Sequence, residues 1–171
     1  MRRQEDRMKL DLREIIEIPG ASLPFRCTLD VGRLDFPSVV RYGAEPEAEG
    51  LVQNTAGLLT LTGTLKADMV CVCDRCAREY DCHKELPLRV ALSANESDED
   101  GDDVFPLEGN FLDLDDVLET CFILDMEAKH LCREDCKGLC DRCGANMNDG
   151  PCGCKATADP RLAVLEQLLD K

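Results

Sequence analysis

The chain has 171 residues, a net charge of −15, 44% hydrophobic residues and 4% aromatic residues, a composition that supports one hydrophobic core or one core with a small satellite. Its charged start, Met1 to Arg7, precedes no apolar run, and no segment reaches the ~18 consecutive apolar residues of a membrane helix. These features argue against a secreted disulfide scaffold and against a membrane protein. We therefore expect a cytoplasmic protein, in which the twelve cysteines stay reduced and indicate metal binding.

Three segments are expected in the N-terminal part. Met8 to Ile18 begins with alternating apolar residues and ends at the turn signal Pro19-Gly20, which predicts a strand. Phe25 to Val31 alternates in the same way and predicts a second short strand. Pro37 to Gly50 is rich in Pro, Gly and Glu, and this composition predicts an irregular connector.

A longer hairpin is expected next. Apolar residues alternate with threonines and charged residues from Leu58 to Cys71 and again from Cys82 to Leu92, which predicts two half-buried strands. We expect these strands to form an antiparallel hairpin with Cys73-Asp74-Arg75-Cys76 near its tip. Four cysteines fall on apolar faces of the expected strands and helix, and we predict them to be core residues: Cys27, Cys71, Cys82 and Cys121.

The negative charge is concentrated in the middle of the chain. Val90 to Ala128 contains thirteen acidic residues and no Lys or Arg, whereas the rest of the chain is close to neutral. Within this segment, residues 95–103 (NESDEDGDD) form a low-complexity run that predicts an exposed loop. Such a segment repels phosphate and attracts basic partners, and the alternative interpretation is a solvated loop that only confers solubility.

Two helices are expected after the acidic run. Asp113 is a suitable N-cap for a segment of helical spacing, about 113–126, whose acid-rich first turn suits the positive end of a helix. Asp159-Pro160 opens a closing helix with a stripe of leucines. We therefore predict an α+β fold. A mostly antiparallel β core spans residues 1–128, and a zinc-binding, cysteine-rich lobe with the closing helix spans residues 129–171 and packs on the core as one unit.

Eight cysteines form the candidate metal sites. The tetrapeptide Cys-Asp-Arg-Cys occurs at 73–76 and again at 140–143, and a C-x-x-C turn places two sulfurs where one tetrahedral ion can take both at ~2.3 Å. Four further cysteines lie in the same C-terminal stretch. Eight thiolates suffice for two closed structural zinc sites, whose ligands would be Cys73, Cys76, Cys132, Cys136, Cys140, Cys143, Cys152 and Cys154.

The spacing leaves the division of these ligands open. One partition joins the 73/76 pair with Cys132 and Cys136, and it leaves the last four cysteines to a second ion. Another joins the two identical tetrapeptides, as in a zinc ribbon, and a third has a single ion with spare cysteines. We favour the first partition because it keeps the second site within one short loop.

Other chemistries fit the sequence less well. Iron–sulfur ligation uses differently spaced cysteines, and a thioredoxin-like redox pair requires a neighbouring βαβ unit. No Ser-His-Asp or Cys-His constellation and no Gly-rich phosphate loop is evident, so we expect neither an enzyme nor a small-molecule substrate. His83 and His130 lie in polar surroundings and are predicted to be surface residues, with His130 as a possible replacement for a cysteine ligand.

Taken together, these motifs resemble the YceD family. The shared features are the hairpin with C-x-R-C at its tip, an acid-rich segment and a helix, then DCKGLC from Asp135 to Cys140, CG-x-N-x-N ending at Asn148, C-x-C, and the ending D-P-R-L-A-x-L. The resemblance covers roughly Met8 to Leu169, with Asp141 where the family usually has proline. Members are described as large ribosomal RNA subunit accumulation proteins, which implies a role in assembly of the large ribosomal subunit without an agreed reaction.

Two functions are compatible with these features. In the first, the protein is a noncatalytic factor that promotes accumulation of large-subunit (23S) rRNA, and its partner is a ribosomal protein or a pre-ribosomal large-subunit particle. In the second, it is a zinc-dependent nucleic-acid-binding protein that contacts rRNA directly. The phosphate contacts would then come from basic residues around the cysteine cluster, namely Lys129, Arg133, Lys137, Arg142 and Lys155.

Overall fold

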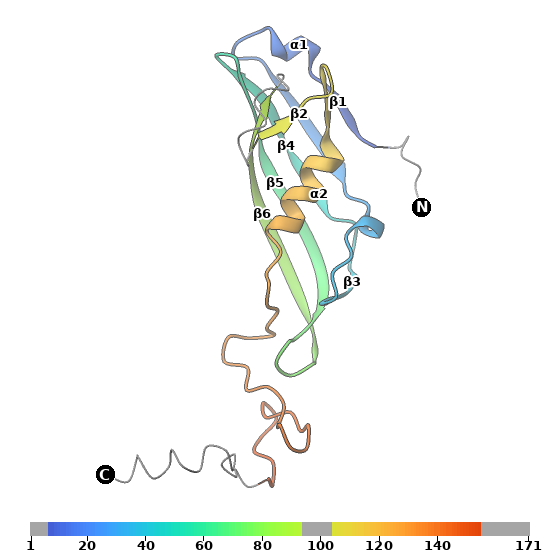
Figure 1. Cartoon of the computed structure of the whole chain (residues 1–171), viewed down its shortest axis with the longest axis vertical. Helices are drawn as coiled ribbons and strands as arrows, with labels where there is room; N and C mark the ends of the chain where they lie inside the picture. Colours follow the sequence, from blue (N-terminus) through green and yellow to red (C-terminus); the bar gives the residue numbers. More distant parts are fainter. Residues whose placement is uncertain (1–6, 94–103, 155–171) are drawn as a thin grey trace, which may run out of the picture.

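The computed structural model describes residues 7–93 and 104–154, and it confirms an α+β fold made mostly of antiparallel strands (Figure 1). The predicted acidic loop at 95–103 and the predicted closing helix from Asp159 lie outside the described residues. The elements follow in this order: β1 (Lys9–Asp11), α1 (Arg13–Ile16), β2 (Ser22–Thr28), the 3₁₀ helix η2 (Val31–Arg33), β3 (Val39–Tyr42), β4 (Glu47–Thr55), β5 (Leu58–Val72), β6 (Glu79–Ser93), β7 (Val104–Pro106), β8 (Phe111–Asp113) and α2 (Leu114–Leu124).

The hairpin of β5 and β6 is the longest feature of the sheet and confirms the prediction from the period-two pattern. The strands pair without interruption from Leu59 opposite Leu92 to Val72 opposite Glu79. Alternate residues of both strands, such as Leu61 and Leu88, are buried on the inner face. This register places residues 73–78 in the turn that joins the strands, so the first Cys-Asp-Arg-Cys tetrapeptide lies at the hairpin tip.

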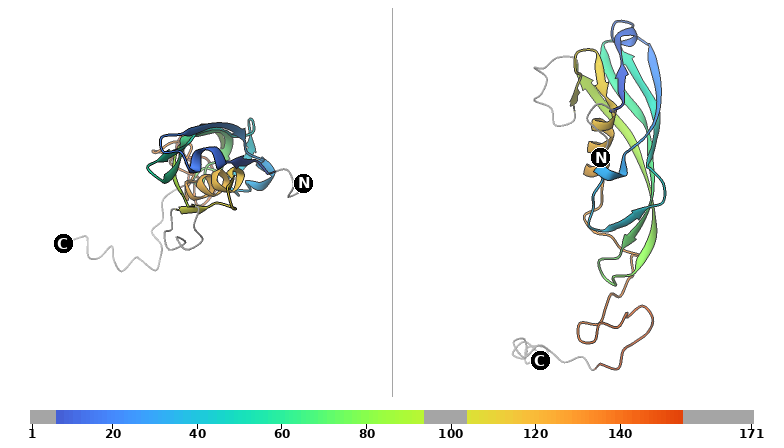
Figure 2. Two further views of the ribbon diagram at one scale, coloured as in Figure 1. Left: turned by 90° about the horizontal axis from the view of Figure 1, so that it is seen from above. Right: turned by 90° about the vertical axis from the view of Figure 1, so that its right-hand side faces the viewer.

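The other strands and α2 complete one core around this hairpin. The main sheet has the order β2-β4-β5-β6-β7, and β3 pairs with the end of β5 near the hairpin tip. Figure 2 shows α2 lying along one face of the sheet. On the buried side of α2, Leu118 and Phe122 are completely buried, and the Phe122 ring meets the edge of Phe36 at a centroid distance of 5.9 Å.

Both ends of α2 are held by charged side chains. Asp113 caps the helix by accepting a hydrogen bond from the backbone N–H of Asp116, and the Arg7 guanidinium lies 2.7 Å from the Asp113 carboxylate. At the other end, the buried Lys84 on the inner face of β6 donates to the Asp125 carbonyl and contacts the Glu127 carboxylate at 3.2 Å. The chain therefore leaves α2 in a fixed direction towards the hairpin tip.

The prediction of one strand from Met8 to Ile18 is wrong beyond β1. After three strand residues the chain turns into α1, where the N–H groups of Ile15 and Ile16 both bond to the Leu12 carbonyl. The buried Asn54 of β4 holds this turn, because its side-chain amide donates to the carbonyls of Ile15 and Ile16. This partner is nearly forty residues away, so local periodicity does not reveal it.

The prediction of an irregular connector from Pro37 to Gly50 is also wrong, since β3 and the start of β4 lie in it. The inner face of β4 carries Ala48, Val52 and Asn54, a small and partly polar set that conceals the period-two pattern. Gly50 also has a tertiary role. A Cβ at this position would lie 2.7 Å from the Cα of Gly63 and 3.0 Å from the Phe25 ring.

Candidate metal centres

The hairpin tip forms a tight knuckle around the first cysteine pair. The N–H of Ala77 bonds to the Cys73 carbonyl at 2.8 Å, and the N–H of Cys73 bonds to the Arg78 carbonyl at 3.0 Å. These bonds close a turn that carries both Cys73 and Cys76, and both side chains are buried. The knuckle thus presents two sulfurs to whatever packs over the tip.

The segment after α2 packs over this knuckle through hydrogen bonds to its backbone. The N–H of Asp74 bonds to the His130 carbonyl at 2.8 Å, and the Asp74 carboxylate accepts the N–H of His130 at 2.6 Å. On the other side, the Arg75 guanidinium donates to the Cys136 carbonyl at 2.9 Å, and the Arg75 carbonyl accepts the N–H of Leu139. These bonds place the segment that contains Cys132 and Cys136 across the tip.

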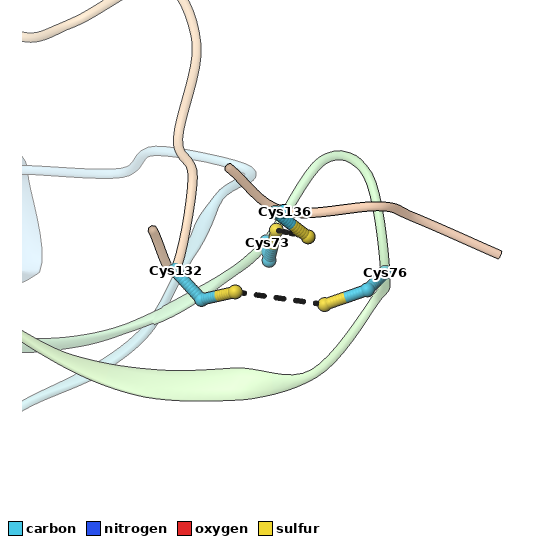
Figure 3. Close-up of side chains that lie close together, drawn as sticks. All are labelled: Cys73, Cys76, Cys132 and Cys136. Atoms are coloured by element: carbon cyan, nitrogen blue, oxygen red, sulfur yellow. Dashed lines mark hydrogen bonds between the residues drawn. The ribbon is translucent and has the colours of Figure 1, made fainter. Parts of the chain in front are cut away.

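Four sulfurs converge where these two parts of the chain meet (Figure 3). The sulfurs of Cys73 and Cys136 lie 3.8 Å apart, those of Cys76 and Cys132 lie 3.7 Å apart, and all four lie within 4.8 Å of one another. Four sulfurs at ~2.3 Å from one ion in a tetrahedron are separated by about 3.8 Å. The first group therefore has the dimensions of a tetrahedral thiolate site.

Local hydrogen bonds prepare Cys73 for ionisation. Burial alone would raise its pKa, but the backbone N–H groups of Cys132, Cys76 and Arg75 point at its sulfur and lower the pKa to about 6. The Cys132 thiol has the opposite shift, because burial and its contact with Cys136 raise its pKa to about 12. Four adjacent thiols cannot all ionise without a cation, because their negative charges repel one another. A bound cation would offset this repulsion.

Asn148 is a further residue of the first group. Its side-chain amide donates to the Cys136 sulfur at 3.3 Å, and this bond is the main cause of the lowered pKa of Cys136. Its carbonyl oxygen accepts from the N–H of Lys137 and from the Arg133 guanidinium. Asn148 thus orients a sulfur as a hydrogen-bonding residue behind a metal ligand does. The sequence marks Asn148 as the last residue of the C-G-x-N-x-N motif, but this motif alone did not predict its hydrogen bond to a cysteine sulfur.

A second group of sulfurs lies entirely within the C-terminal lobe, which extends beyond the hairpin tip (Figure 1). It consists of Cys140, Cys143, Cys152 and Cys154, whose sulfurs also lie within 4.8 Å of one another. Backbone N–H groups of Cys143 and of the preceding residue lower the pKa of Cys140 to about 7, whereas the contact with Cys143 raises that of Cys154 to about 12. Cys143 and Cys154 are exposed, so this group is much more accessible than the first.

The structure groups the eight predicted cysteines as in the first partition, with 73/76 beside 132/136 and the last four together. The two tetrapeptides do not share a site. The four cysteines that were predicted to be core residues belong to neither group. Cys27 and Cys71 are buried, and Cys82 and Cys121 are half-buried against the same core.

The two histidines differ. His83 is exposed, as predicted, and its Nδ1 lies 2.6 Å from the Asp68 carboxylate. The prediction of a surface position for His130 is wrong, because it is only 5% exposed. Its backbone bonds to Asp74 at the hairpin tip draw the residue inward. Neither histidine belongs to the groups of possible metal ligands in the described residues.

The arrangement is suited to holding structure together. Each group offers four thiols and no carboxylate or histidine, which describes closed coordination without an open position for a substrate. The first group joins the hairpin to a segment nearly sixty residues later, whereas the second closes one local loop. None of the helices in residues 7–93 and 104–154 has the length and hydropathy that a membrane span requires.

Comparison with known proteins assigns a family. The chain is 25% identical over 168 residues to uncharacterised proteins of Mycobacterium tuberculosis H37Rv and Mycobacterium bovis, which covers 95% of this chain and 81% of theirs. An uncharacterised protein of Mycobacterium leprae is 26% identical over 157 residues, which is 88% of this chain and 72% of that protein. No solved structure matches. Residues 61–169 match the family described as large ribosomal RNA subunit accumulation protein YceD, and the chain belongs to this family.

Proposed function

We propose that the protein is a noncatalytic cytoplasmic factor in biogenesis of the large ribosomal subunit, and that it promotes accumulation of large-subunit rRNA. The observation that carries this proposal is the family match over residues 61–169, which contains the hairpin tip and all eight grouped cysteines. The closed character of both groups supports a scaffold rather than a reaction centre.

We further propose that both groups bind zinc, with the eight predicted cysteines as ligands. All-thiolate, tetrahedral coordination without water suits Zn²⁺. Metal analysis by mass spectrometry of protein purified under reducing conditions should find about two zinc ions per chain, with eight thiols protected until a chelator is added. Metal-free protein with freely reacting thiols would contradict the assignment.

The charge distribution supports a basic partner. Helix α2 and the segment after it carry acidic residues, and Val90 to Ala128 contains no Lys or Arg. A negative surface attracts basic proteins and repels rRNA phosphates, which fits a ribosomal protein or a pre-ribosomal particle as partner. If pull-downs from growing cells recover neither a ribosomal protein nor a pre-ribosomal particle, the proposal of a basic ribosomal partner is contradicted.

Depletion of the protein tests the function itself. We expect depleted cells to accumulate less large-subunit rRNA than small-subunit rRNA, with a reduced large-subunit peak on sucrose gradients. Wild-type protein should restore the ratio, and Cys76→Ser, which opens the buried group, should not. Cys121→Ser is the matched control, because Cys121 is a half-buried cysteine outside both groups. An unchanged rRNA ratio after depletion would refute the function.

Direct rRNA binding is the second candidate. Lys129, Lys137 and Arg142 have no ion-pair partner among the described residues, and exposed cations around a metal lobe can contact phosphate. Arg133 is less available, because it contacts Asp135 and Asn148. Affinity for an rRNA fragment should then fall steeply between 50 and 200 mM salt. Binding that is insensitive to salt would argue for the protein partner instead.

A further inference from the structure

A cavity of about 410 Å³ lies beside the hairpin tip, between the residues before β3, the end of β5 and the segment after α2. Its walls include the apolar side chains of Phe36, Val72 and Met126, and its polar residues include Asp74, Glu127 and His130. It is separate from both cysteine groups, although Asp74 and His130 neighbour the first group in sequence.

One of the residues that line the cavity has a polar atom without a hydrogen-bond partner among the described residues. His130 is 95% buried, and its Nε2 atom makes no hydrogen bond within the described part of the chain. A buried polar atom without a partner costs about 1–3 kcal/mol. The backbone of His130 is fixed by its two hydrogen bonds to Asp74, which keep the residue beside the cavity. A ligand bound in the cavity would be one source of a partner for Nε2.

The cavity is electrically negative. Asp74 and Glu127 bring two carboxylates, and the wall contains no Lys or Arg. Lys84 contacts Glu127, but it also contacts Asp125, so two carboxylates share this ammonium group and no lysine contact is made to Asp74 among the described residues. The carboxylates of Asp74 and Glu127 are hydrogen-bond acceptors. A matching ligand would be a cation that only donates, with an aliphatic stem for the apolar wall.

We propose that this cavity binds an arginine side chain of a basic partner protein. A guanidinium group offers five donors in a planar fork, pairs with carboxylates and stacks on aromatic rings such as Phe36. Its methylene stem suits Val72 and Met126. No group of three metal-ligating side chains lies in the cavity among the described residues, which disfavours a metal ion here. Only the identification of the partner as a ribosomal protein rests on the proposed function.

The test uses the full chain, purified under reducing conditions with its metal, and NMR of its methionine methyl and histidine ring signals. N-acetyl-arginine amide should shift the signals of Met126 and His130 saturably, with a dissociation constant on the order of 1 mM. N-acetyl-citrulline amide has nearly the same shape but no charge, and it should not shift these signals. Equal shifts with both amides, no shift with either, or equally tight binding of spermidine would overturn the assignment.

Two variants locate the binding. Glu127→Gln keeps an acceptor for Lys84 but removes a charge, and it should weaken binding of the arginine amide about tenfold. Asp74→Asn keeps an oxygen for the N–H of His130 and should act similarly. Glu49→Gln on the outer face of β4 is the control and should bind normally. Equal weakening in the control would refute the site, whereas the rRNA ratio after depletion would be unaffected by that result.

Discussion

Each Cys-Asp-Arg-Cys knuckle closes on a residue with a positive φ. In the first knuckle this residue is Ala77, with φ 54°, and in the second it is Gly144, with φ 70°. The N–H of each bonds to the carbonyl of the first cysteine of its tetrapeptide. The left-handed conformation costs an L-residue about 1–2 kcal/mol, so the same turn is strained at Ala77 and relaxed at Gly144.

Exchanging these two residues should therefore have opposite effects. Gly144→Ala places a Cβ in open space but imposes the left-handed cost. It should weaken binding of the proposed zinc ion at the second group about fivefold in competition with a chromophoric chelator. Ala77→Gly removes strain at the first knuckle and should raise the melting temperature by about 1–2 °C after the entropy of the unfolded chain is included. Equal weakening by both variants would show that neither turn depends on its φ.

Asn148 offers a second test at this scale. Asn148→Asp keeps the oxygen that accepts from Lys137 but replaces the donor to Cys136 with a negative charge. Loss of this bond should weaken metal binding at the first group by about 10- to 100-fold and leave the second group unchanged. Asn110→Asp, far from either group in the turn before β8, is the control. Wild-type metal affinity at the first group of Asn148→Asp would mean that the bond to the Cys136 sulfur contributes nothing to metal binding.

Among the elements, α2 is the one whose stability depends on pH through a well-defined contact. Burial opposes ionisation of Asp113, but Arg7 and the N–H of Asp116 lower its pKa below the usual value of 3.8. Because the pKa is lower in the folded state, the contribution of Asp113 is complete above pH ~4 and is lost as the pH falls through the lowered pKa. It is thus present at neutral pH and disappears in acid.

Asp113→Asn should isolate this contribution, since Asn is also a good N-cap. The variant should be less stable than the wild type by about 1 kcal/mol in urea unfolding at pH 7, and the difference should shrink below pH 4. Both proteins keep the same cysteine groups, so acid would release a metal ion bound there equally from both. A difference that grows towards low pH would contradict the assigned sign.

The elements also show how far the sequence could predict this protein. The long hairpin and α2 were predictable because period-two and helical patterns are local and the cap lies at Asp113. The eight cysteines were also predictable as a set, because residue type and spacing are written in the chain, but the spacing left open how they divide into two groups. Three features were not predictable, because each depends on a contact with a residue far away in the sequence. Helix α1 depends on Asn54, strand β4 on the close approach of the Gly63 backbone, and the burial of His130 on its bonds to Asp74. The division into 1–128 and 129–171 stays a prediction.

At the scale of the whole molecule, the two cysteine groups should contribute unequally to stability. The first group is largely buried and joins sulfurs 63 and 56 residues apart, whereas Cys140 and Cys152 are separated by only 12 residues. Closing a longer loop removes more entropy from the unfolded chain. An ion bound at the first group would also hold the lobe on the hairpin, so removal of its ligands would free both parts.

Paired double variants test this inequality. Cys132→Ser with Cys136→Ser should lower the melting temperature by about 10 °C and release Cys73 and Cys76 to thiol reagents. Cys152→Ser with Cys154→Ser removes the same number of thiols and should lower the melting temperature by only a few degrees. Truncation before Cys132 should resemble the first variant. Melting of the truncated chain at the wild-type temperature would show that hairpin and lobe share no ion.

The distance in sequence between the halves of the first group also determines when the site can form. At about 5–20 residues per second of synthesis, Cys132 follows Cys76 by roughly 3–11 s, because 56 residues separate them. The second group is complete once Cys154 has been added, 18 residues after Cys136, which takes roughly 1–4 s more. The hairpin therefore leaves the ribosome with two bare thiols at its tip. During that interval the nascent chain can hold a metal only loosely, and the completed site marks a chain whose synthesis has passed residue 136.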